Sequence, residues 1–208
     1  MTRLETVLIR LDSDLRKLGC RWALVGGMAV SVRARPRTTV DVDVAVAVRG
    51  DEEAEQLIGR FRALGYEVRS TVEQTATGRL ATVRLAPPLE GGAPASDSDR
   101  HTTVVDLLLA SSGIEPEIAA AAERLTILPG LSVPVATIGH LLALKVLAEQ
   151  ENRPQDRADA IALIATARPR DLREAEHALE LIGRRGYDRG KNLRSALERV
   201  LSTRPEAE

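Results

Sequence analysis

The chain has 208 residues, of which 44% are hydrophobic and 28% are charged, and its net charge is −1 at pH 7. This composition is typical of a globular protein and argues against a uniformly basic nucleic-acid coat, while leaving room for a local basic patch. The charge-broken N-terminus is unlike a signal peptide, and no apolar run reaches the roughly 18 residues that a membrane span needs, so we expect a cytoplasmic protein with no membrane segment.

The first 136 residues have the pattern of alternating helices and strands. Apolar residues recur at helical spacing over 3–18, and a short strand over 21–25 leads into Gly26-Gly27, with a second helix expected from the second glycine. The other predicted elements are helices over 51–64 and 115–123, strands over 39–48, 66–70, 79–85 and 102–109, a hairpin over 124–136 and a surface loop over 86–100.

The segment 39–48, Thr-Val-Asp-Val-Asp-Val-Ala-Val-Ala-Val, places two acids in a valine-rich strand. Strict alternation puts Asp41 and Asp43 on one face, about 7 Å apart along a backbone that rises ~3.3 Å per residue. Two carboxylates this close repel each other unless cations neutralise them, and Mg²⁺ prefers such oxygen ligands. The pair therefore predicts a divalent metal site of the kind used in phosphoryl or nucleotidyl transfer.

Two further features fit a site that handles phosphates. Gly26-Gly27 lies at a strand-to-helix turn, where the backbone can approach a phosphate and helix N–H groups point at it. Asp106 lies within the apolar stretch Thr-Thr-Val-Val-Asp-Leu-Leu-Leu, where an unpaired carboxylate would be costly. If its strand lies beside that of Asp41 and Asp43, Asp106 can ligate a second metal ion and help to deprotonate an attacking hydroxyl.

From residue 137 onward the sequence becomes helical. Helices are predicted over 138–150, 155–167, 171–183 and 190–202. We therefore expect a chain made of an α/β part over 1–136 and a helical part over 137–208.

These residues resemble the nucleotidyltransferase superfamily related to DNA polymerase β. The superfamily pattern is Gly-Gly or Gly-Ser, a spacer, Asp-x-Asp, and a third acid on a later strand. The matching residues are Gly26, Gly27, Asp41, Asp43 and Asp106. The resemblance implies that the three aspartates are catalytic and hold Mg²⁺ or Mn²⁺, and that an NTP is the substrate.

The same resemblance implies an α+β fold. Its core over 1–136 would be the polymerase β-like nucleotidyltransferase fold, a mixed sheet flanked by helices. The helical C-terminal domain over 137–208 would complete the NTP site.

A narrower resemblance covers about residues 20–167. The stretch Arg-Thr-Thr-Val-Asp-Val-Asp, which begins at Arg37, resembles the Arg-x-Thr-x-Asp-x-Asp form of the AbiEii/AbiGii toxin family, which includes the MenT-type nucleotidyltransferase toxins. The second signature of this family is an apolar-Pro-apolar strand, a helix with a lysine, and Arg and Asp residues that open the next helix. The matching residues are Val133-Pro134-Val135, Lys145, Arg153, Asp156 and Asp159.

The lysine of this signature fits an NTP site. Lys145 is one of only three lysines, and it lies among leucines in the middle of a predicted helix. An ammonium is costly there unless it is paired, and a triphosphate is a suitable partner, although a lysine that extends its head to the surface is the alternative.

The charged neighbours of this lysine in the signature also belong to the expected NTP site. Asp156 and Asp159 share a helix face and can orient Lys145 or Arg153 or contact the nucleotide. An acidic helix N-terminus favoured by the dipole explains Asp156 equally well, whereas Asp159 lies deeper in the helix and is the stronger candidate for the site. We expect Arg37 to contact phosphate or to form an ion pair with the aspartates.

The family resemblance also implies the acceptor and the partner. Such toxins are similar to enzymes that add nucleotides to the 3′ end of tRNA, and each is paired with an antitoxin protein. The segment 184–204 carries seven basic and two acidic residues and can hold an RNA backbone or form a solvated helix. Two alternatives stay open, namely transfer to a small molecule of the aminoglycoside type or to a protein side chain, and a catalytically inactive binding module of the same fold.

Overall fold

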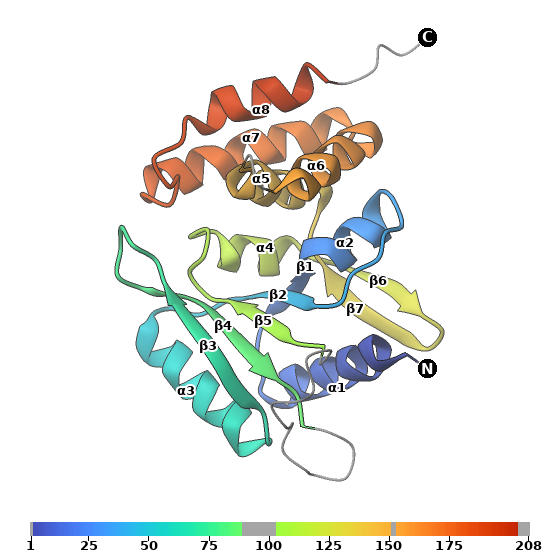
Figure 1. Cartoon of the computed structure of the whole chain (residues 1–208), viewed down its shortest axis with the longest axis vertical. Coiled ribbons are helices and arrows are strands. Elements are labelled where there is room, and N and C mark those ends of the chain that lie inside the picture. Colours follow the sequence, from blue (N-terminus) through green and yellow to red (C-terminus); the bar gives the residue numbers. More distant parts are fainter. Residues whose placement is uncertain (1, 89–102, 151–152, 204–208) are drawn as a thin grey trace.

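A seven-stranded mixed sheet organises the part of the chain that the structure describes. The computed structural model (Figure 1) describes residues 2–88, 103–150 and 153–203, so most of the loop expected over 86–100 lies outside it. The strand order is β3-β4-β5-β2-β1-β7-β6. The strands are β1 (Trp22–Val25), β2 (Val42–Val46), β3 (Glu67–Glu73), β4 (Leu80–Ala86), β5 (Val105–Leu108), β6 (Glu123–Leu128) and β7 (Leu131–Val135).

Helices cover this sheet and form most of the C-terminal part. Figure 1 shows the last four helices, orange to red, gathered at one end of the molecule, with α1 and α3 across the sheet from them. The helices are α1 (Arg3–Lys17), α2 (Gly26–Arg33), α3 (Asp51–Ala63), α4 (Glu115–Ala121), α5 (Ile138–Ala148), α6 (Pro154–Thr166), α7 (Pro169–Arg184) and α8 (Leu193–Leu201). The mixed sheet flanked by helices confirms the α+β fold class.

Strand pairing at the centre of the sheet brings distant segments together. β2 is antiparallel to β1 and parallel to β5, and β1 is parallel to β7. Val42, Val44 and Ala45 are fully buried, so both faces of β2 are covered along most of its length. Side chains of β2 therefore alternate between the two faces of the sheet, as the sequence predicts. The two faces differ in their packing partners rather than in their exposure to solvent.

Several boundaries differ from the sequence predictions. α2 begins at the first glycine instead of the second, because Gly26 takes a positive φ of 63° that ends β1 abruptly. β3 runs three residues beyond the predicted end and β5 is shorter than predicted. The added residues of β3, Thr71-Val72-Glu73, pair with β4 but are all exposed, so they lack the alternation of apolar and polar residues that marks a half-buried strand.

One hydrophobic cluster contains buried residues of both halves of the chain, so the division at residues 136 and 137 remains a prediction.

In the described ranges, no helix combines the length and apolar character required to cross a bilayer.

Candidate active site

The paired glycines allow two charged side chains to pack against the start of α2. A Cβ atom on Gly26 would lie 1.9 Å from Oδ2 of Asp43, and one on Gly27 would lie 2.2 Å from Nη2 of Arg37. At Gly26 the positive φ of 63° and the contact with Asp43 both favour glycine, whereas a side chain at Gly27 would displace the guanidinium of Arg37. The close approach that the sequence predicted for a phosphate is made here by the side chains of Asp43 and Arg37.

The three candidate catalytic acids lie at the same end of the central strands. Asp43 is opposite Val25 on β1 and opposite Asp106 on β5. Paired residues of neighbouring strands project to the same face, so Asp43 and Asp106 point the same way. Asp41 lies one residue before β2 and two before Asp43. The neighbouring strands that the sequence required for this convergence are therefore present.

Electrostatics at Asp43 show that this group of acids lacks compensating charge. Burial, and then the negative charge of Asp106, raise the pKa of Asp43 from 3.8 to about 6, while the nearby Lys145 ammonium opposes the shift. Burial also raises the pKa of Asp41, and the Arg84 guanidinium opposes that shift. A cation bound between these carboxylates would relieve both effects.

Arg84, which the sequence reading did not single out, supplies part of this positive charge. It lies opposite Asp106 in the β4–β5 ladder and holds that carboxylate with two hydrogen bonds, Nε to Oδ1 at 2.8 Å and Nη2 to Oδ2 at 2.7 Å. The same Nη2 atom is 4.0 Å from Oδ2 of Asp41. The pairing with Asp106 raises the pKa of Arg84. A guanidinium therefore occupies a place in the acid cluster that suits a cation.

The three carboxylates fit a hard divalent cation, provided that Arg84 moves away from Asp106. Within the described residues, no group of three or more His, Cys, Asp or Glu side chains is arranged to hold a metal as it stands. All three candidate ligands are carboxylates, which Mg²⁺ and Mn²⁺ prefer, and Arg84 already shows that a positive group is accommodated there. Because the side chain of Arg84 is 45% exposed, it has room to leave Asp106.

A second charged cluster comes from α5 and α6. The ammonium of Lys145 lies 2.9 Å from Oδ1 of Asp156 and 2.8 Å from Oδ2 of Asp159. All three residues are buried, with exposed fractions of 9%, 3% and 2%. Such burial favours the interpretation of Lys145 as a paired internal charge over a lysine that extends to the surface.

Two arginines complete this cluster. Arg37 pairs with Asp159 through Nε at 2.9 Å and Nη2 at 3.1 Å. Arg153 lies 2.9 Å from Asp156 and is more than half exposed. Arg37 follows α2 and Asp159 lies on α6, so this pair joins the α/β part to the helical part.

A cavity of about 180 Å³ connects Asp43 with the lysine cluster. Its lining includes Gly26, Asp43, Lys145, Arg153 and Asp156. The cavity lies against the carboxyl end of β1 and the first turn of α2, with α5 opposite. Arg189 and Ser111 also line it, and the guanidinium donates hydrogen bonds to the Ser111 carbonyl and hydroxyl oxygens.

The positions of these two residues carry little signal in the sequence. Arg189 is one of many arginines in a basic segment and Ser111 belongs to a serine-rich turn.

Two solved structures resemble this chain over more than nine-tenths of its length, and the first of them supports the same fold. A solved structure of an antigenic nucleotidyltransferase-like protein from Paracoccidioides brasiliensis matches with a TM-score of 0.53 and 22% identity, over 94% of this chain and 92% of that one. A structure of ANT(2″)-Ia in complex with adenylyl-2″-tobramycin has a TM-score of 0.49 and 13% identity, over 95% and 98% of the two chains. No curated protein matches the chain.

The family of the chain follows from a separate comparison. The model of the nucleotidyl transferase AbiEii toxin family, which belongs to type IV toxin–antitoxin systems, matches residues 11–208. The match includes every residue of both charged clusters. This protein is therefore a nucleotidyltransferase of the AbiEii toxin family.

Proposed function

We propose that this nucleotidyltransferase uses Mg²⁺ or Mn²⁺ to transfer a nucleotide from an NTP to the 3′ end of tRNA, and that a cognate antitoxin protein restrains it. The observation that carries the proposal is the meeting, around one cavity, of Asp43 with Lys145 and its partner Asp156. The family to which the chain belongs supports the toxin role.

The lysine cluster is suited to hold a triphosphate. An ammonium has three N–H donors, and Asp156 and Asp159 use two of those of Lys145, which leaves one for a phosphate oxygen in the cavity. Arg37, Lys145 and Arg153 carry three positive charges against the two aspartates, so the cluster retains a net charge of +1 for an anion. In this role the aspartates fix the position of Lys145, and the ammonium and guanidinium groups bind the nucleotide.

The strand acids are suited to the chemical step. Asp41 and Asp43 would hold the divalent ion, which supplies charge neutralisation for the phosphates when it is bound. Asp106, once Arg84 has moved away, accepts the proton of the acceptor hydroxyl. The acceptor oxygen then forms a bond to the α-phosphorus as the bond to the bridging oxygen breaks, and pyrophosphate leaves.

The basic C-terminal segment supports an RNA acceptor only in part. Arg185 pairs with Glu117, Arg189 binds Ser111, and Lys191 donates to carbonyl oxygens at the end of α5. These cations hold the fold together. Among the described residues of this segment, Arg184 and Arg199 are exposed, and so is Arg194, which lies 3.9 Å from Glu180. These three cations can face an RNA backbone.

The test is transfer of label from each α-³²P-labelled NTP in the presence of Mg²⁺, with total tRNA, an aminoglycoside mixture or total cell protein as separate acceptors. We expect labelled tRNA, with the label lost in Asp43→Asn and kept in Glu55→Gln, a control on the exposed face of α3. Label on the drug or on protein with none on tRNA would overturn the tRNA assignment. The absence of any turnover would favour an inactive binding module.

A further inference from the structure

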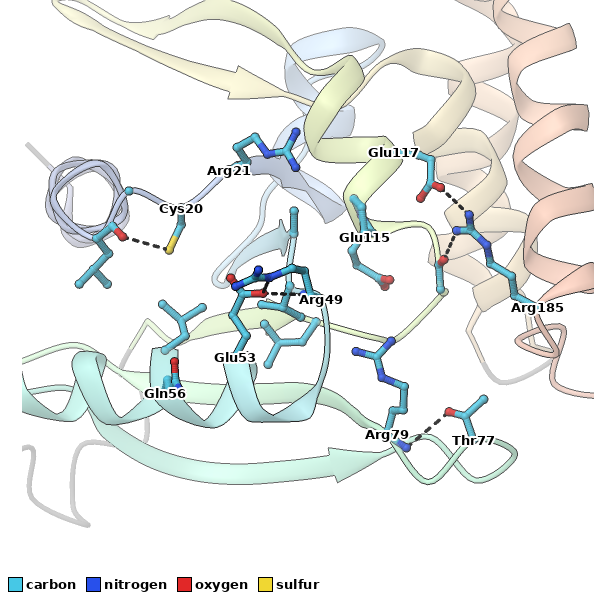
Figure 2. A pocket seen from close by; sticks show the side chains of 18 of the residues that line it. Cys20, Arg21, Arg49, Glu53, Gln56, Thr77, Arg79, Glu115, Glu117 and Arg185 are labelled. Carbon is cyan, nitrogen blue, oxygen red and sulfur yellow. Dashed lines mark hydrogen bonds and ion pairs between the residues drawn. The ribbon is translucent and has the colours of Figure 1, made fainter.

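A second and larger cavity, of about 780 Å³, lies away from the acids (Figure 2). It opens at the other end of the central strands, where its lining includes Arg21 before β1, Val48 after β2 and Leu109 after β5. Ala47, which also lines it, is four residues beyond Asp43, or about 13 Å along an extended strand. The cavity is therefore separate from the proposed NTP site.

The turn before α4 separates the two cavities. Ser111 and Ser112 line the smaller one, whereas Gly113 and Glu115 line the larger one. A Cβ on Gly113 would lie 2.5 Å from the ring of Tyr187, so this turn is packed tightly against the helical part.

Buried polar atoms without partners line the larger cavity. Glu115 is 1% exposed, and its Oε1 accepts hydrogen bonds from Ser112 N at 2.7 Å and Oγ at 2.9 Å, but its buried Oε2 has no partner among the described residues. The buried Nη2 of Arg79 also lacks a partner in that part of the chain. In Figure 2 the carboxylate of Glu115 and the guanidinium of Arg79 point into the same space from opposite walls.

Such atoms call for an explanation, because a buried polar group that makes no hydrogen bond is destabilising. Here an acceptor and a donor face one cavity. A ligand that presents an N–H group to the carboxylate and an anionic group to the guanidinium would satisfy both.

The remaining lining narrows the class of ligand. The lining residues include five arginines and three glutamates. Asp51, which is not part of the lining, pairs with Nε of Arg79 at 3.3 Å, so one excess positive charge remains and favours an anion. Leu57, Val48 and Leu109 provide an apolar wall. The volume lies in the range of about 300–1,000 Å³ that is typical of sites for drug-sized molecules, and is much larger than an inorganic ion or a single amino acid requires.

We propose that this cavity binds a nucleotide whose base carries an amino group, either as a free nucleoside monophosphate or as a nucleotide of an RNA strand. The amino group donates to Oε2 of Glu115, the base packs on the apolar wall, and the phosphate lies against Arg79. This site is distinct from the proposed NTP site, since it contains none of the residues assigned there.

Cytosine and uracil nucleotides provide a matched pair of probes of the same size. The amino group at C4 of cytosine is a carbonyl in uracil, and the neighbouring N3 changes from an acceptor to an N–H donor. Titration calorimetry on the full chain with CMP and UMP, and with the dinucleotides CpC and UpU, compares free and strand-borne nucleotides. We expect the cytosine form of at least one pair to bind about tenfold more tightly than the uracil form.

The substitution Glu115→Gln keeps an oxygen for Ser112 and turns an N–H donor towards the cavity. It should remove or reverse the preference for cytosine. Arg79→Gln, at a partly exposed position, should weaken both members of a pair equally, whereas Arg62→Gln on the exposed surface of α3 should change neither.

Equal binding of the cytosine and uracil forms in both pairs, no binding of either pair, or a cytosine preference unchanged in Glu115→Gln would overturn the proposal. The same titrations in Asp43→Asn separate it from the proposed function. The preference should persist there even though nucleotidyl transfer is lost, and a preference that disappears in Asp43→Asn would assign the binding to the NTP site instead.

Discussion

Neutralising Asp43 should make the protein more stable while it removes activity. Burial and the charge of Asp106 raise the pKa of this carboxyl group from 3.8 to about 6. A shift of roughly 2 pKa units corresponds to about 3 kcal/mol at 1.36 kcal/mol per unit. At pH 8 without divalent metal, the ionised carboxylate therefore costs the folded state up to about 3 kcal/mol relative to a neutral group of the same shape, and Asp43→Asn removes this cost.

The gain in the free energy of unfolding on replacing Asp43 by Asn should depend on pH. Because the folded-state pKa lies above the unfolded value, the wild-type protein is stabilised by protonation of Asp43 below about pH 4, and this contribution is lost as the pH rises through about 6. The difference between Asp43→Asn and wild type should therefore be near zero at pH 4 and largest at pH 8. A gain of this size corresponds to roughly 6–12 °C in Tm for a chain of this length.

Urea unfolding followed by circular dichroism at pH 4 and pH 8, in EDTA, measures both values. Glu55→Gln, which also removes one negative charge but lies on an exposed helix face, controls for net charge and should change the free energy of unfolding by less than about 0.5 kcal/mol. If Asp43→Asn is no more stable than wild type at pH 8, or gains equally at both pH values, the electrostatic interpretation of the acid cluster is wrong.

Three further substitutions probe the same region. Gly26→Ala should lower the free energy of unfolding by more than about 1 kcal/mol, because its Cβ meets the Asp43 carboxylate and its φ is 63°; an unchanged urea midpoint would contradict this close approach. Arg84→Gln frees Asp106 from its bidentate partner, so Mn²⁺ binding measured by electron paramagnetic resonance should tighten about tenfold, and an unchanged Kd would show that Arg84 does not compete with the ion. Lys145→Met leaves two buried carboxylates without their ammonium, so the free energy of unfolding should fall by about 3–5 kcal/mol. NTP binding, measured on the folded fraction, should also weaken. An NTP affinity equal to that of wild type would show that the lysine does not belong to the site.

The parts of the site that the sequence predicted are those that leave a local signal. Asp43 and Asp106 stand out because each interrupts an apolar strand, where a carboxylate needs a reason to be present. Lys145 stands out for the same reason, and also because the chain has only three lysines among 29 basic residues.

The parts that the sequence could not predict depend on tertiary pairing. Arg84 becomes a partner of Asp106 only through the register of β4 against β5, which no local pattern specifies. Arg37 pairs with Asp159 across 122 residues, so only the packing of α2 near α6 could have identified that partner.

The ion pairs that join the α/β part to the helical part can form only late in synthesis, because their two partners lie far apart in the sequence. While the polypeptide emerges from the ribosome, Arg37 and the strand acids are made before α5 and α6, so Arg37 has no Asp159 to bind. Under the proposed roles, a nascent toxin is harmless to the ribosome that makes it until nearly 160 residues have left the exit tunnel. Damage to the translation machinery then begins only after synthesis of each copy is almost complete.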